Sequence, residues 1–114
     1  MLKLGANKIR DLTNNVFRTL RNLERLDLFG NQLTTIHSDS FGIHRYLKEI
    51  NLSGNKINAI DEKFIDNTAV NRLEMRENIC SQEKIEGRDE MKRKLDECFK
   101  NYKPRVEQSK LELS

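Results

Sequence analysis

Apolar residues recur along this chain in a block that is repeated at a nearly constant spacing. In each block, apolar residues stand at the first, fourth, sixth and eleventh positions, and an asparagine stands at the ninth. Three blocks cover residues 23–33, 47–57 and 70–80, and residues 2–9 carry the last part of a fourth. The alternation within a block, as in Leu26-Asp27-Leu28, puts successive side chains on opposite faces of a short strand. The pattern therefore predicts one short strand per block.

The segments between the blocks carry a second apolar register, which predicts an arm that returns the chain to the next strand. Its members are Ile9, Leu12 and Phe17, then Leu33, Ile36 and Phe41, then Ile57, Ile60 and Phe64. The place held by Leu20 in the first arm is held by His44 in the second and Asn67 in the third. Because two of these residues are polar, we expect the arms to pack loosely there, with His44 as a partly exposed filler and not a metal ligand.

These blocks resemble the leucine-rich repeat family, whose block reads L-x-x-L-x-L-x-x-N-x-L. The 24-residue spacing with a phenylalanine in the arm is similar to the typical subclass, which is mostly extracellular. The resemblance implies an α/β solenoid, a fragment of a horseshoe, with short parallel strands on its concave face and irregular or 3-10 arms on its convex face. The repeats are expected over residues 1–79 and a helical cap over residues 80–104. Residues 105–114 have mixed charge and little to bury, so we expect a disordered tail, or else the start of a longer helix.

The block asparagines are polar residues set between apolar anchors, so they need hydrogen-bond partners inside the fold. They are Asn7, Asn31, Asn55 and Asn78, at intervals of 24, 24 and 23 residues. Stacked amides can satisfy the backbone groups of neighbouring repeats. We therefore expect a structural asparagine ladder.

The segment after the last block predicts a helix over residues 87–102, ended by Pro104. Its apolar stripe consists of Met91, Leu95, Cys98, Phe99 and Tyr102. Such a helix can cover the open edge of the last strand, as a terminal cap must.

Cys80 and Cys98 resemble a shortened form of the cysteine-bearing C-terminal cap of extracellular leucine-rich repeat proteins, which implies a disulfide between them. The common form of that cap has four cysteines, so two buried thiols remain the alternative. A redox couple or a metal site is disfavoured, because a CxxC spacing is absent and no histidine lies nearby in the sequence.

The non-leucine strand positions of the blocks predict the binding surface, because they face solvent on the concave side. The candidate partner-binding residues are Arg25, Asp27, Phe29, Glu49, Asn51, Arg72, Glu74 and Arg76. Phe29 is the aromatic of this set, and its arginines can pair with carboxylates on a partner. The alternative is a solvated face with mutual ion pairs, such as Asp27 with Arg25. The sequon at Asn51 is expected to be unused, since a glycan would crowd this face.

Composition adds exclusions to this picture. The net charge of +3 comes from 21 basic and 18 acidic residues that are scattered along the chain, which gives no electrostatic case for a nucleic acid or an anionic membrane. No apolar run approaches the roughly 18 residues that a membrane span needs. No nucleophile–base set, paired carboxylates, phosphate loop or metal spacing can be assigned. We therefore expect a non-catalytic protein-recognition module without cofactor or metal.

The first block is incomplete, which leaves the first strand uncovered. We expect either a fragment of a longer protein, with further repeats ahead of Met1, or coverage by a partner or a second copy. A fragment would also explain the lack of a signal peptide. The expected context is a secreted or cell-surface protein of adhesion, signalling or innate-immune type. The alternative is an intracellular scaffold or regulatory subunit with reduced cysteines.

Overall fold

The computed structural model describes residues 1–10, 12, 20–38 and 42–102 of the 114-residue chain. Within these ranges the elements are, in chain order, β1 (Leu2–Lys3), β2 (Arg25–Asp27), β3 (Thr35–Ile36), β4 (Glu49–Asn51), β5 (Ala59–Ile60), α2 (Lys63–Asp66), β6 (Arg72–Glu74), β7 (Lys84–Glu86) and α3 (Arg88–Lys94). Residues 96–102 are also helical.

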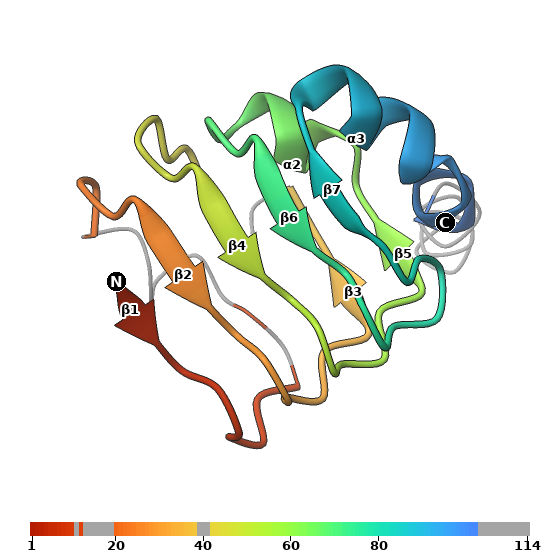
Figure 1. Cartoon of the computed structure of the whole chain (residues 1–114), viewed down its shortest axis with the longest axis horizontal. Helices are drawn as coiled ribbons and strands as arrows, with labels where there is room; N and C mark the ends of the chain where they lie inside the picture. Colours follow the sequence, from red (N-terminus) through yellow and green to blue (C-terminus); the bar gives the residue numbers. More distant parts are fainter. Residues whose placement is uncertain (11, 13–19, 39–41, 103–114) are drawn as a thin grey trace, which may run out of the picture.

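The main sheet has the strand order β1-β2-β4-β6-β7, and its first four strands run parallel (Figure 1). Leu2 lies beside Leu26, Leu26 beside Ile50, and Ile50 beside Leu73. These partners are 24, 24 and 23 residues apart, which are also the intervals between the block asparagines. The expected α/β fold with short strands is therefore confirmed, and these four strands are parallel as expected.

A second, smaller sheet pairs β3 with β5 in parallel, and Figure 1 shows it behind the main sheet. Ile36 and Ile60, which are register partners in this sheet, join the core cluster that also contains the strand residues Leu26, Ile50 and Leu73. All five side chains are no more than 2% exposed. The two apolar registers of the sequence thus fill one core from opposite sides.

The arms differ in part from the irregular or 3-10 segments that were expected. The second arm contributes β3, and the third contributes both β5 and the α-helical turn α2, on which Phe64 is fully buried. Phe17 and Phe41 lie outside the described residues.

His44 corrects another expectation, because its exposure is only 2%. Its backbone forms a parallel bridge with Thr68, in which the His44 N–H donates to Asn67 O at 2.9 Å and the Ala69 N–H donates to His44 O at 3.2 Å. Pairing between the arms draws His44 inward, whereas Leu20 at the same place in the first arm is 38% exposed. The arms are therefore packed more tightly at His44 than its polarity suggested.

The C-terminal segment contains a strand that was not expected. β7 pairs antiparallel with β6, placing Ile85 beside Leu73, and Ile85 is fully buried. The edge of β6 is therefore covered by β7 and not by a helix, which corrects both the all-parallel sheet and the proposed position of the cap. The predicted helix is also divided at Leu95, whose φ of −100° and ψ of 11° end α3.

The helical segments still present the predicted apolar stripe to the core. Met91, Leu95 and Cys98 are fully buried, Phe99 is 5% exposed and Tyr102 is partly exposed. Cys80 and Cys98 form a disulfide, with an S–S distance of 2.06 Å, so the pairing implied by the resemblance is confirmed. Among the described residues, no helix has the length and apolar character needed to cross a membrane. The expected tail over residues 105–114 lies outside the described residues.

Candidate functional site

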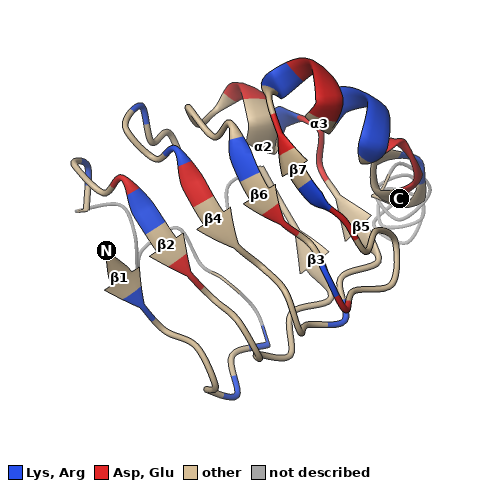
Figure 2. Cartoon of the chain, in the orientation of Figure 1, with Lys and Arg blue, Asp and Glu red and all other residues tan. Residues whose placement is uncertain are grey.

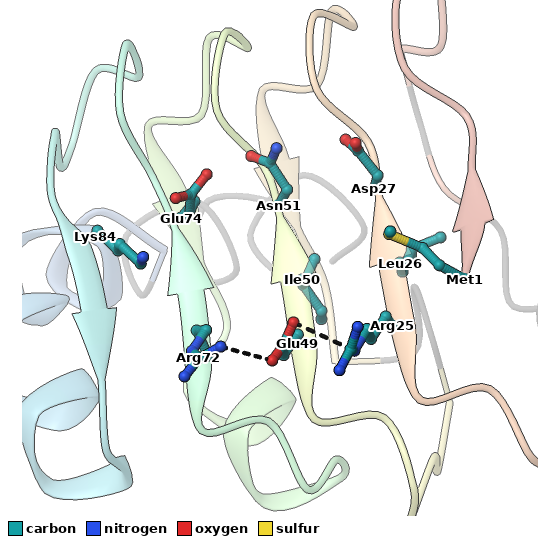
Figure 3. Close-up of a pocket in the computed structure, with 10 residues that line it drawn as sticks. All are labelled: Met1, Arg25, Leu26, Asp27, Glu49, Ile50, Asn51, Arg72, Glu74 and Lys84. Carbon is teal, nitrogen blue, oxygen red and sulfur yellow. Dashed lines mark hydrogen bonds and ion pairs between the residues drawn. The ribbon is translucent and has the colours of Figure 1, made fainter.

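In β2, β4 and β6, the residue before the central residue and the residue after it point away from the core, so the sheet presents two rows of outward side chains. Leu26, Ile50 and Leu73 are buried, so the residues on either side of each point to the opposite face. On that face lies a shallow hollow of about 310 Å³ (Figure 3). Its lining consists of Met1, Arg25, Leu26, Asp27, Glu49, Ile50, Asn51, Arg72, Glu74 and Lys84. We call the outward side chains of this lining the sheet face.

Six of the eight candidate partner-binding residues are thus brought together, and two are not. Phe29 and Arg76 do not line the hollow. Met1 and Lys84 line it although the sequence did not point to them. Lys84 was missed because β7 was not expected, since the alternation Lys84-Ile85-Glu86 is shorter than the four to eight residues, roughly, that indicate a strand.

The first row of the sheet face is an ion-pair ladder across four strands. Arg25 Nε lies 3.5 Å from Glu49 Oε2, Arg72 Nη1 lies 2.9 Å from Glu49 Oε1, and Arg72 Nε lies 3.5 Å from Glu86 Oε1. Figure 2 shows the same alternation of basic and acidic positions across β2, β4 and β6. These pairs are largely exposed, so each contributes about 0–1 kcal/mol. The ladder orders the side chains more than it stabilises the fold.

The ion pair suggested between Arg25 and Asp27 is wrong, because each side chain has another partner. Arg25 pairs across the sheet with Glu49. Asp27 Oδ1 accepts a hydrogen bond from the Phe29 N–H at 2.9 Å. Parallel pairing places Glu49 directly beside Arg25, whereas Asp27 lies two residues along the same strand.

The second row contains Asp27, Asn51 and Glu74, which are neighbours in the register. Asn51 Oδ1 accepts a hydrogen bond from the Ser53 N–H at 3.0 Å, as Asp27 does from Phe29. Neither Asp27 nor Glu74 forms an ion pair with a described residue, and Lys84, beside Glu74 in the register, is 4.0 Å from Glu86 instead. This row therefore carries the carboxylates of the sheet face that are still available to a ligand.

Phe29 lies beyond the end of β2 and is 47% exposed. Its ring rests against Gly54 of the next repeat, where an added Cβ would come within 3.2 Å of Phe29 Cε2. Gly54 also has a φ of +72°, which favours glycine. Phe29 is thus a supported aromatic at the rim of the sheet face.

The block asparagines connect consecutive repeats. Asn55 donates to the carbonyl oxygens of Leu28 and Leu52, at 3.0 and 2.9 Å, and its Oδ1 accepts from the Leu33 N–H at 3.1 Å. Asn31 and Asn78 make the equivalent bonds, and all three residues are at most 5% exposed. Asn7 is exposed and bonds within its own turn, to Leu4 O and Gly5 O. The amides hold the strands in register and thereby fix the geometry of the sheet face.

Comparison with known proteins agrees with this architecture. A sequence model described as leucine rich repeat matches residues 1–57, which is half of the chain. The chain is also similar to epiphycan from Gallus gallus, with 39% identity over 56 residues. That match covers 49% of this chain and only 18% of the length of epiphycan. With repeats that coincide in sequence, strand register and asparagine position, the chain belongs to the leucine-rich repeat family.

Proposed function

We propose that this chain is a non-catalytic protein-recognition module that binds a protein partner through its sheet face. The observation that carries the proposal is that the central residues of β2, β4 and β6 and the residues beside them lie in different places. The central residues fill the core, while six neighbouring side chains gather around one hollow and stay outside the core cluster. Family membership supports a binding role of this kind.

The proposed binding residues divide by chemistry. Asp27 and Glu74 offer carboxylates that are not neutralised by a described residue, and Asn51 between them offers an amide. Phe29 and Arg76 extend the surface beyond the hollow, with Phe29 as an aromatic contact of the kind that dominates binding energy at interfaces. We further propose that the repeats form a solenoid with this face on its concave side, which the near-constant register offsets support.

We propose an extracellular or cell-surface location, as part of an adhesion, signalling or innate-immune type of protein. The Cys80–Cys98 disulfide supports it, because disulfides persist mainly in oxidising compartments. An intracellular scaffold would instead hold both thiols reduced. Mass spectrometry of non-reduced protein from its native source separates the two: a linked Cys80–Cys98 peptide supports the extracellular proposal, and free thiols overturn it.

The binding proposal is tested by cross-linking and then by affinity. A photo-reactive amino acid placed at Asn51 should capture a partner in native tissue extract, and the same amino acid placed at Arg45, outside the hollow, should not. The affinity of the captured partner is then measured for the unmodified chain and for the double variant Phe29→Ala with Arg72→Glu. We expect at least a tenfold loss of affinity, since hot-spot residues each contribute about 2 kcal/mol or more.

The matched control is Tyr46→Ala with Arg45→Glu, which also removes one exposed aromatic and reverses one exposed arginine. It should leave the affinity unchanged. Equal affinity of both double variants and the unmodified chain would remove the sheet face from the interaction.

A further inference from the structure

A second hollow, of about 420 Å³, lies away from the sheet face and is lined by Arg10, Gln32, Thr34 and Lys56. We call it the donor groove. Among the described residues, no acidic side chain belongs to its lining. Its residues come from three consecutive repeats, at the segments that follow β1, β2 and β4.

The backbone holds these segments side by side. The Gln32 N–H donates to Ile9 O at 2.8 Å, and the Lys56 N–H donates to Leu33 O at 2.9 Å. Because the register offset is 24 residues, Gln32 and Lys56 occupy equivalent places, which Lys8 also occupies one repeat earlier. Lys8, Arg10 and Lys56 are all exposed. The fold thus brings two cations from distant parts of the sequence, Arg10 and Lys56, to one hollow, and Lys8 lies two residues before Arg10.

The hydrogen bonding of the groove favours anions. Arg10 Nε donates a hydrogen bond to Gln32 Oε1 at 3.1 Å. This bond orients the amide of Gln32, and its NH₂ group can still donate to a ligand. The guanidinium nitrogens of Arg10 and the ammonium of Lys56 form no ion pair with any described residue. Among the described lining side chains, Arg10 and Lys56 can only donate, whereas Gln32 and Thr34 can both donate and accept.

We propose that the donor groove binds the sulfate groups of a sulfated polysaccharide. Its cations lie on separate repeats along an open surface, so several anionic groups on one chain can be contacted together. The part of the lining that the structure describes has no aromatic ring on which a nucleic-acid base could stack. The Cys80–Cys98 disulfide supports an oxidising compartment, in which polysaccharides rather than nucleic acids carry dense negative charge. The groove shares no residue with the lining of the sheet face, so it can be tested separately.

The test measures binding of the whole oxidised chain to immobilised heparin at several NaCl concentrations. The variant Arg10→Gln with Lys56→Gln should bind about tenfold more weakly near physiological salt and should show a shallower dependence on salt, because two charge contacts are lost. The matched control, Arg45→Gln with Lys92→Gln, removes two exposed cations outside the groove and should stay within about twofold of the unmodified chain. Circular dichroism melting verifies that both variants remain folded, and Lys56→Gln alone replaces the double variant if Arg10→Gln unfolds the chain.

Three results would overturn the proposal. Equal losses in the groove variant and the control would indicate diffuse charge rather than a site, and unchanged binding to fully desulfated heparin would exclude sulfate recognition. Single-stranded DNA or polyglutamate could also bind as tightly as heparin or more tightly, and lose this binding in the groove variant. That result would assign the groove to a nucleic acid or to an acidic peptide instead. The double variant Phe29→Ala with Arg72→Glu should keep its heparin affinity, so failure of the sheet-face proposal is distinguishable from failure of this one.

Discussion

Asn78 accepts a hydrogen bond at its Oδ1 from the backbone N–H of Ile57, 3.0 Å away, although the two residues belong to consecutive repeats. The same side chain donates to Leu52 O in the earlier repeat at 2.8 Å and to Met75 O in its own repeat at 3.1 Å. One buried amide thus joins the last repeat to the one before it. Side chains of this kind connect consecutive repeats alongside the backbone pairing of the short strands.

Replacing Asn78 by alanine should therefore destabilise the fold by about 2–3 kcal/mol, because the buried N–H of Ile57 loses its acceptor. Denaturant unfolding followed by circular dichroism measures the change. Asn7→Ala is the matched control: Asn7 is exposed and bonds within its own turn, so its loss should cost less than about 1 kcal/mol. Similar losses for the two variants would show that the amide does not connect the repeats energetically.

Arg88 should be a second determinant of stability, at the start of α3. Its guanidinium donates to the carbonyl oxygens of Ile65, Thr68 and Val70, at 2.6, 3.1 and 3.1 Å, and so joins the cap to the last arm. Arg88→Met keeps much of the aliphatic stem but leaves these carbonyls without their charged donor, and we expect a loss of about 3 kcal/mol. Arg93→Met, which removes only an exposed pair with Glu90, should change the free energy of unfolding by less than about 1 kcal/mol. Thermal unfolding of both variants decides whether Arg88 has this role.

The Cys80–Cys98 disulfide should stabilise the chain by about 3 kcal/mol, as expected for a loop of this size. The double variant Cys80→Ala with Cys98→Ala should unfold at a lower denaturant concentration than the oxidised chain. Adding a reductant should bring the unmodified chain close to the double variant and leave the variant itself unchanged. If the reductant does not move the midpoint of the unmodified chain, the cap is held by its packing alone.

Stability should also respond to pH through Glu90 on α3. The pKa of Glu90 lies below its usual value of 4.5, first because Arg93 donates a hydrogen bond to it and then because Arg93 and Lys94 are positively charged. A carboxyl group whose pKa is lowered by folding stabilises the fold above its unfolded pKa, and this contribution disappears as the pH falls through the folded value. Glu90→Gln should therefore lower the melting temperature slightly at pH 7, and the difference should vanish at acidic pH.

Salt provides the control for this pH effect, because Glu90 and its partners are at the surface. The difference between Glu90→Gln and the unmodified chain at pH 7 should shrink at about 1 M NaCl, where exposed charges are screened. A difference that persists in high salt and at acidic pH would trace the effect to helix propensity and not to the ion pairs.

The repeat architecture could be predicted from the sequence because it depends on side-chain chemistry that recurs at one spacing. Leu26, Ile50 and Leu73 can all be buried only when strands shifted by one repeat lie side by side, and the register follows from that requirement. The residues of the sheet face, such as Asp27 and Asn51, follow from the same alternation. Cys98 could be placed on the buried stripe of the cap for a similar reason, since its helical spacing matches that of Met91 and Leu95.

Only the tertiary structure decided which of these side chains meet. Glu49 pairs with Arg25 and Arg72 because strand pairing places these two arginines directly beside it on the neighbouring strands. β7 escaped prediction because a strand with one apolar residue, Ile85, has too short a pattern to be recognised until β6 offers an edge. The donor groove arises in the same way, since the stacking of three consecutive repeats brings Arg10 and Lys56 to the lining of one hollow. The sequence by itself determined the period and the core, and the contacts between repeats determined the chemistry of the surface.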